Sequence, residues 1–118
     1  MNRKILVIED EKLLNDTISS FLTYSDFDVV SAYDGKSAIS KAKECKPDLI
    51  LLDVMLPGIY GYDIAKEIRK FSEVPIVFLT SVEDQESKDK AFKSGATDYL
   101  SKSIDLEILV EKINRILG

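Results

Sequence analysis

Short apolar runs separated by longer stretches of helical period are the feature that most constrains the fold of this chain. The runs ILVI, LILL and PIVFL, at residues 5–8, 49–52 and 75–79, are uninterrupted, which predicts strands buried on both faces of a sheet. Residues 27–32 and 98–100 are two further predicted strands. Strands and helices that alternate along a chain form βαβ units, in which the strands are parallel and helices cover both faces.

The segments between these strands carry amphipathic stripes that predict helices. The first stripe comprises Leu13, Leu14, Thr17, Ile18, Phe21 and Leu22, and the last comprises Leu106, Leu109, Val110, Ile113, Ile116 and Leu117. Five strand–helix units in 118 residues predict one α/β domain over residues 1–118, a flavodoxin-like (βα)5 doubly wound parallel sheet of order 2-1-3-4-5. In that order the first and third strands are neighbours, and ligands bind beyond the carboxyl ends of the strands.

Residues 81–95 predict a helix of a different kind, because only Val82, Ala91 and Phe92 offer it apolar side chains. A helix with so little apolar surface gains little stability from packing. We therefore interpret this segment either as a solvated surface helix or as one that shifts between two positions.

The composition excludes several classes of function. A formal charge of −5, with no basic run longer than the pair Arg3–Lys4, argues against direct contact with nucleic acid. No apolar window approaches the roughly 18 residues of a membrane-spanning helix, and no export signal is present, so no membrane contact is predicted. Cys45 is the only cysteine and has no intramolecular partner, which fits a cytoplasmic protein.

Three carboxylates follow the two central strands of the predicted sheet. Glu9 and Asp10 come directly after the first strand and Asp53 after the third, so all three are expected at one edge. Grouped carboxylates repel one another unless a cation compensates them. Carboxylate oxygens are preferred ligands of Mg²⁺, with Mn²⁺ as a second candidate, whereas a chain without histidine is a poor host for zinc or copper.

Thr80 and Lys102 follow the fourth and fifth strands and add a hydroxyl and an ammonium to the same edge. Both groups gain a role if Asp53 carries a phosphoryl group, because phosphoryl transfer needs positioned hydrogen bonds and charge neutralisation. Each residue alone has an ordinary explanation, as a helix-terminal acid, a cap or a solvated lysine. Their combination predicts that Asp53 is a phosphoryl acceptor.

The segments ILVIEDE, DLILLDVMLPGIYG, VPIVFLTS and GATDYLSK resemble, in this order, the receiver domain of a two-component response regulator over the whole chain. The resemblance implies that Asp53 is the phosphorylated aspartate and that Glu9 and Asp10 are the acidic pair that binds the metal. It also implies that the backbone carbonyl of Met55 is a metal ligand. Such a domain promotes its own phosphorylation and dephosphorylation but turns over no free substrate.

By the same resemblance, Thr80 is the switch hydroxyl, Lys102 is the lysine that contacts the phosphoryl group, and Tyr99 is the aromatic residue that turns inward on activation. Tyr99 has an alternative interpretation, as a half-buried strand residue whose hydroxyl lies in water. Two positions depart from the family pattern. Ser103 stands where proline is usual, and Tyr60 stands where aspartate is usual.

The resemblance also implies partners. A sensor histidine kinase or a phosphotransfer protein would supply the phosphoryl group in the cytoplasm. The face made by the fourth helix, fifth strand and fifth helix would carry the signal to an effector domain after Gly118 or to another protein. This face carries charges typical of homodimers in the winged-helix transcription-factor subfamily: Glu86, Lys88, Asp98 and Lys112. Two positions depart from that pattern, because Lys112 stands where arginine is usual and Asp89 stands where an apolar residue is usual.

Three rival interpretations use the same residues. A phosphatase of the haloacid dehalogenase type would need a second aspartate at the position of Met55, together with a cap domain. A flavodoxin would bind its flavin phosphate where the acidic run Glu9 to Glu11 would repel it. A pseudo-receiver, a scaffold that is never phosphorylated, is disfavoured by the complete set of acceptor residues but stays open.

Overall fold

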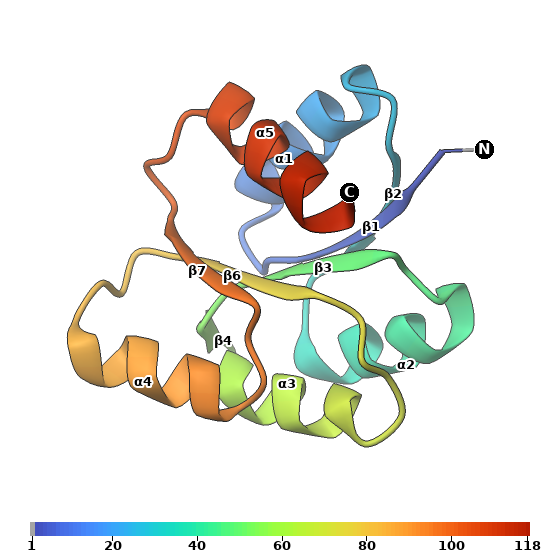
Figure 1. Cartoon of the computed structure of the whole chain (residues 1–118). Coiled ribbons are helices and arrows are strands. Elements are labelled where there is room, and N and C mark those ends of the chain that lie inside the picture. The colour runs from blue at the N-terminus through green and yellow to red at the C-terminus, as the bar shows by residue number, and fades with distance from the viewer. Residues whose placement is uncertain (1) are drawn as a thin grey trace.

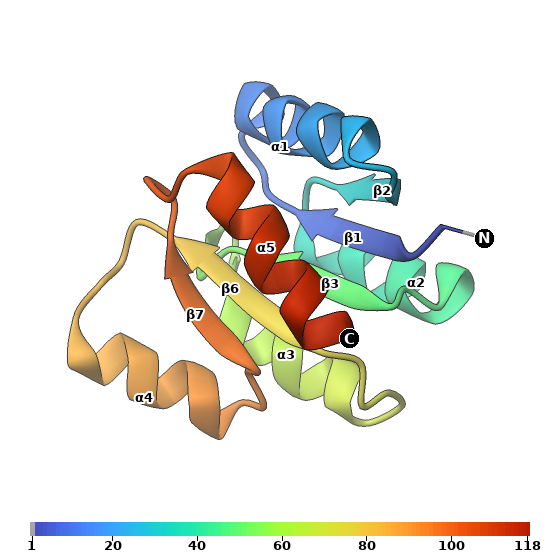
Figure 2. The ribbon, with the colours of Figure 1, turned by 45° about the horizontal axis from the view of Figure 1, so that its top comes forward.

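The computed structural model describes residues 2–118, in which five parallel strands form one sheet in the order β2-β1-β3-β6-β7. The strands are β1 (Lys4–Ile8), β2 (Asp28–Ala32), β3 (Leu49–Leu52), β6 (Ile76–Thr80) and β7 (Asp98–Ser101). Figure 2 shows them side by side, with β3 between β1 and β6. The predicted order 2-1-3-4-5 is confirmed, with β6 and β7 as the fourth and fifth strands.

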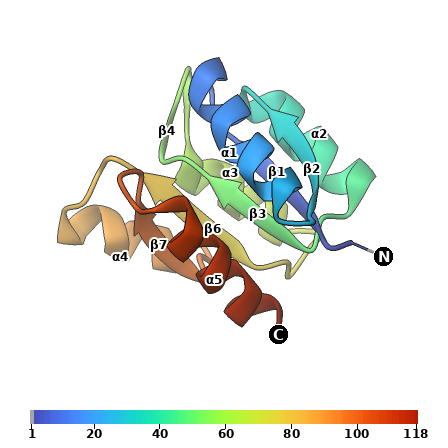
Figure 3. The same ribbon diagram turned by 90° about the horizontal axis from the view of Figure 1, so that it is seen from above.

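Helices cover both faces of this sheet (Figure 1). One face carries α1 (Lys12–Tyr24) and α5 (Leu106–Leu117), and the other carries α2 (Gly35–Cys45), α3 (Gly61–Arg69) and α4 (Gln85–Lys93). From above, α1 and α5 lie in front of the sheet and α2 and α3 behind it (Figure 3). None of the helices in the described residues is long and apolar enough to cross a membrane.

The position of β1, β3 and β6 inside the sheet explains why their sequences are apolar without interruption. Successive side chains of a strand point to opposite faces, so Ile5 and Val7 pack under α1 and α5 whereas Leu6 and Ile8 pack against the opposite helices. The same alternation divides β3 and β6 between the two cores. Every residue of β3 and β6 is buried, which confirms the predicted burial on both faces.

A short antiparallel ribbon after β3 was not predicted. β4 (Met55–Leu56) pairs with β5 (Ile59–Tyr60) across a turn in which Gly58 adopts a φ of 77°. Two residues per strand are too few for a recognisable pattern in the sequence. The ribbon brings the chain back beside the end of β3 before α3 begins.

Two predicted apolar contacts are wrong. Leu13, assigned to the buried stripe of α1, is 75% exposed, because the helix turns Asn15 and Leu22 toward the sheet and Leu13 away from it. Phe92, predicted to help anchor residues 81–95, is 49% exposed. Ala91 is therefore the buried anchor of α4.

Candidate functional site

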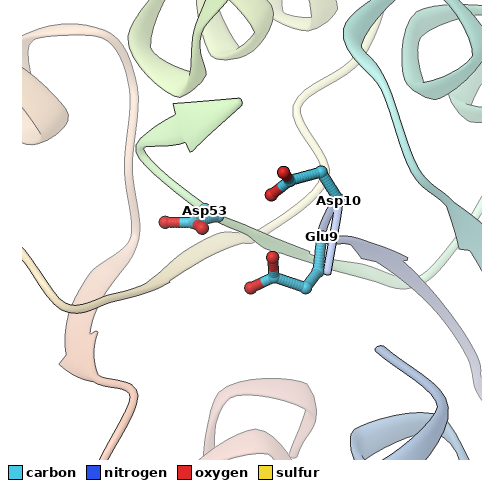
Figure 4. A group of neighbouring side chains, drawn as sticks. All are labelled: Glu9, Asp10 and Asp53. Atoms are coloured by element: carbon cyan, nitrogen blue, oxygen red, sulfur yellow. The ribbon is translucent and has the colours of Figure 1, made fainter. Parts of the chain in front are cut away.

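The carboxyl ends of β1 and β3 bring three carboxylates together. Ile8 and Leu52 are paired in the sheet, so Glu9 and Asp53 leave neighbouring strands at the same level. One carboxylate oxygen from each of Glu9, Asp10 and Asp53 lies within 4.8 Å of the others. Figure 4 shows the side chains of Glu9, Asp10 and Asp53 gathered near one another, with Glu9 and Asp10 extending toward Asp53. Glu9 is 3% exposed and Asp53 4% exposed, whereas Asp10 is open to solvent.

Backbone amides hold two of these carboxylates in place. The amide of Met55 donates to Asp53 Oδ1 at 3.3 Å, and the amide of Glu11 donates to Glu9 Oε2 at 3.0 Å. In both cases the donor lies two residues beyond the acid, as in turns stabilised by an acidic side chain. The side chains are thereby directed across the end of the sheet.

Lys102, which follows β7, compensates the two buried carboxylates. Its Nζ lies 2.6 Å from Glu9 Oε1 and 2.7 Å from Asp53 Oδ2. Lys102 pairs with two of the three carboxylates, so the cluster as a whole retains negative charge. The Lys102–Ser103 peptide is trans, like the other peptide bonds of residues 2–118.

Burial and charge act in opposite directions on these groups. Burial raises the pKa of Glu9 and the charge of Asp53 raises it further, while hydrogen bonds from Lys102 and the Glu11 amide lower it; the net shift is upward. Burial lowers the pKa of Lys102, but its hydrogen bonds to Asp53 and Glu9 outweigh this and raise the pKa overall. The charge states of Lys102 and Glu9 therefore depend on each other.

Thr80 and Tyr99 meet at one residue of the loop between β6 and α4. Thr80 is fully buried and is the last residue of β6, rather than the first residue after the strand as predicted, because it pairs with Ser101 of β7. Its Oγ1 accepts a hydrogen bond from the amide of Val82 at 3.3 Å. The hydroxyl of Tyr99 donates to the carbonyl of the same Val82.

The ring of Tyr99 lies in the core rather than in solvent. It is 9% exposed and packs against Phe78 with 6.1 Å between the ring centroids. Burial, assisted by the nearby Tyr62 and Asp84, raises the pKa of Tyr99 to about 12. Tyr99 does lie on strand β7, but the interpretation that leaves its hydroxyl in water is wrong, because the hydroxyl donates to the carbonyl of Val82.

The four charged residues of the predicted dimer surface lie on α4, β7 and α5. Within the described residues they form a single ion pair, between Glu86 and Lys90 at 3.5 Å along α4. Asp98 accepts a hydrogen bond from the amide of Tyr99 at 2.8 Å. These charges are therefore not tied to one another across the surface.

One buried polar residue of the site was missed by sequence reasoning. Asn15 of α1 is fully buried, and its side-chain amide donates to the backbone carbonyl of Glu9 at 3.0 Å. The available signal in the sequence was a polar residue between Leu14 and Ile18 of the apolar stripe, four positions after Glu11.

The donor set fits a hard divalent cation. The cluster offers only carboxylate oxygens, which suit Mg²⁺ and Mn²⁺, and it lies at the end of a parallel sheet where ligands of such folds bind. A doubly wound sheet with an acidic cluster, a paired lysine and a buried hydroxyl at its carboxyl edge defines a phosphoacceptor class of signalling protein.

The chain belongs to the response regulator receiver domain family, whose sequence profile matches residues 5–114. This is a family of two-component signalling domains rather than of enzymes that turn over a substrate, and its partners are histidine kinases.

Solved structures agree with this assignment. A two-component response regulator from Clostridium difficile is 35% identical, with a TM-score of 0.95 over 98% of this chain and 96% of that one. The BeF3-activated N-terminal receiver domain of RstA from Klebsiella pneumoniae is 33% identical, with a TM-score of 0.93 over 98% of each chain. A CheY-like receiver from Methanospirillum hungatei, 22% identical with a TM-score of 0.95 over 99% of this chain and 94% of that one, shares the fold.

Proposed function

We propose that Asp53 accepts a phosphoryl group from a phosphohistidine of a sensor histidine kinase or of a phosphotransfer protein. The observation that carries this proposal is the ammonium of Lys102, 2.7 Å from Asp53 Oδ2 at the end of a buried strand. A cation held beside a carboxylate nucleophile is what phosphoryl transfer requires. These 118 residues contain no histidine, so the phosphohistidine donor lies outside them.

The proposed transfer is a displacement at phosphorus. An Oδ atom of Asp53 forms the new P–O bond while the P–N bond to the donor imidazole breaks, and the electron pair of that bond stays on the imidazole nitrogen. Asp53 reacts as a carboxylate, so it has no proton to lose. Lys102 Nζ, 2.7 Å from Asp53 Oδ2, supplies positive charge beside the reacting oxygens.

Neighbouring groups share the charge of the transferred phosphoryl group. Glu9, Asp10 and Asp53, with the backbone carbonyl of Met55, are the proposed ligands of Mg²⁺ or Mn²⁺. When bound, the ion neutralises charge on the carboxylates and on the phosphoryl oxygens. Lys102 would contact a second phosphoryl oxygen.

Thr80 and Tyr99 are the proposed output of the site. A hydroxyl that turns to a phosphoryl oxygen has to leave the amide of Val82, and Tyr99 is held by the carbonyl of that residue. Movement of the Thr80 hydroxyl and release of the Tyr99 hydroxyl would both shift Val82 and the start of α4. That helix has Ala91 as its buried anchor. This supports the interpretation of residues 81–95 as a segment that moves between two positions.

The surface of α4, β7 and α5 would report this change in the cytoplasm. Its proposed reader is a second copy of the chain, through the charges on Glu86, Lys88, Asp98 and Lys112, or an effector domain. The similarity to an N-terminal receiver domain supports an effector further along the polypeptide. Membership of the winged-helix subfamily is part of this proposal.

Intact mass after incubation with acetyl phosphate and Mg²⁺ tests the acceptor. We expect one added phosphoryl group on the wild type, none on Asp53→Asn, and a normal adduct on Glu11→Gln, which removes an exposed carboxylate next to the site. Chelation of the metal should abolish the adduct. If no phosphodonor, including a histidine kinase, produced an adduct, the chain would be a pseudo-receiver.

A further inference from the structure

The side chain of Asn15 joins α1 to the ends of two strands. Its Nδ2 donates to the carbonyl of Glu9 at 3.0 Å and to the carbonyl of Ala32 at 3.2 Å, and lies 3.5 Å from that of Val7. Ala32 ends β2, and its carbonyl also accepts from the amide of Glu9 at 3.1 Å. Asn15 therefore lies where β1 and β2 end and the acidic residues begin.

A neighbouring hydroxyl sets the direction of this amide. Ser19 Oγ donates to Asn15 Oδ1 at 3.0 Å, so the oxygen faces Ser19 and the NH₂ group faces the carbonyls. Ser19 Oγ also lies 3.1 Å from Ser31 Oγ of β2. The amide is thus held in one orientation by α1 and by the neighbouring strand.

The carbonyl that Asn15 binds is part of the peptide between two proposed metal ligands. Rotation of the Glu9–Asp10 peptide would redirect the side chain of Asp10. That side chain is exposed, and within the described residues no hydrogen bond or ion pair orients it. Beyond Asp10 the chain enters α1, where the amide of Asn15 donates to the carbonyl of Glu11 at 2.9 Å. One residue therefore fastens the acidic segment at both ends.

We infer that Asn15 is a positioning residue for the cation site. It sets the Glu9–Asp10 peptide before a cation binds, so that binding does not have to order this segment, and its N–H groups offset the negative ends of the carbonyl dipoles beside the three carboxylates. Partners that orient metal ligands typically change metal affinity by about 10- to 100-fold when they are removed. This inference rests on the proposed function of the acidic cluster.

Titration with Mg²⁺ alone tests the inference. Binding is measured from the amide chemical shifts of Asp10 and Asp53 and by calorimetry. Asn15→Leu keeps the shape of the side chain and removes its donors, and we expect it to raise the Mg²⁺ dissociation constant by about tenfold or more. The matched control is Ile18→Val, which weakens packing of the same helix without touching the amide. The control should bind Mg²⁺ within about twofold of the wild type.

The outcomes separate this inference from the function on which it rests. If the wild type bound no Mg²⁺, the proposed cation site itself would be wrong. If the wild type bound Mg²⁺ and a folded Asn15→Leu bound it equally well, only the positioning role would be overturned. Should Asn15→Leu not fold, Asn15→Ser, which leaves one short hydroxyl in place of the amide, has to show the same direction of change, and unchanged affinity there would equally overturn the inference.

Discussion

Replacement of Lys102 by methionine tests whether its ammonium is the counter-ion of the buried carboxylates. The substitution keeps most of the aliphatic side chain and removes the charge that lies 2.6 Å from Glu9 and 2.7 Å from Asp53. Both carboxylates are then buried without a counter-charge and keep only the backbone amides of Glu11 and Met55 as donors. Removal of one member of a buried ion pair costs about 3–5 kcal/mol. Because 22% of the Lys102 side chain is exposed, we expect a loss of about 3 kcal/mol in the free energy of unfolding.

Urea denaturation at neutral pH with a chelator measures this loss. Lys90→Met is the matched control, because it breaks the 3.5 Å ion pair between Lys90 and Glu86. The side chain of Lys90 is 59% exposed and that of Glu86 is 81% exposed. An exposed pair of this kind contributes about 1 kcal/mol or less. The loss in Lys102→Met should therefore be several times larger than the loss in the control.

Addition of Mg²⁺ provides the second half of this test. A ligand present at about 100 times its dissociation constant adds about 2.7 kcal/mol to the free energy of unfolding. In Lys102→Met the cation would replace the missing ammonium, so its stabilisation should exceed that in the wild type. Equal stability of Lys102→Met and the control without metal would refute the argument that Lys102 compensates the two carboxylates.

Three further predictions concern other parts of the site. Because the pKa of Glu9 is raised above its ordinary value of 4.5, the metal-free domain should lose stability as the pH rises from 4.5 through that raised pKa, and Glu9→Gln should flatten this dependence in urea titrations. Met55, two residues after the acceptor, is 52% exposed and cannot orient an attacking water, so Met55→Asn should speed loss of the phosphoryl group; an unchanged decay of the phosphorylated mass would contradict this. Gly61→Ala would put a Cβ 2.2 Å from the carbonyl oxygen of Asp53 and 2.9 Å from the ring of Phe78, so it should cost about 3 kcal/mol in thermal unfolding.

Patterns of short range made the fold predictable. The alternation of apolar runs with helical stripes predicted a parallel sheet, because burial on both faces leaves no polar position in an inner strand. The order of the strands followed from the doubly wound fold that five such units fit. The acids that end these runs could be assigned to one edge because parallel strands share the direction of their carboxyl ends. The exposed Leu13 was misplaced because its stripe allowed more than one rotation of the helix, and packing against the sheet selected the one with Asn15 and Leu22 inside.

The sequence by itself predicted the parallel sheet and the acidic cluster at its edge. It also supplied the hypothesis that Asp53 is the phosphoryl acceptor. The tertiary structure decided which partners these groups have: Lys102 with both Glu9 and Asp53, Tyr99 with the carbonyl of Val82, and Asn15 with the strand ends. These contacts join residues that are distant in the chain, and their geometry depends on strand register and on side-chain direction. Neither strand register nor side-chain direction can be read from a short segment of the sequence, because both result from how the whole core packs.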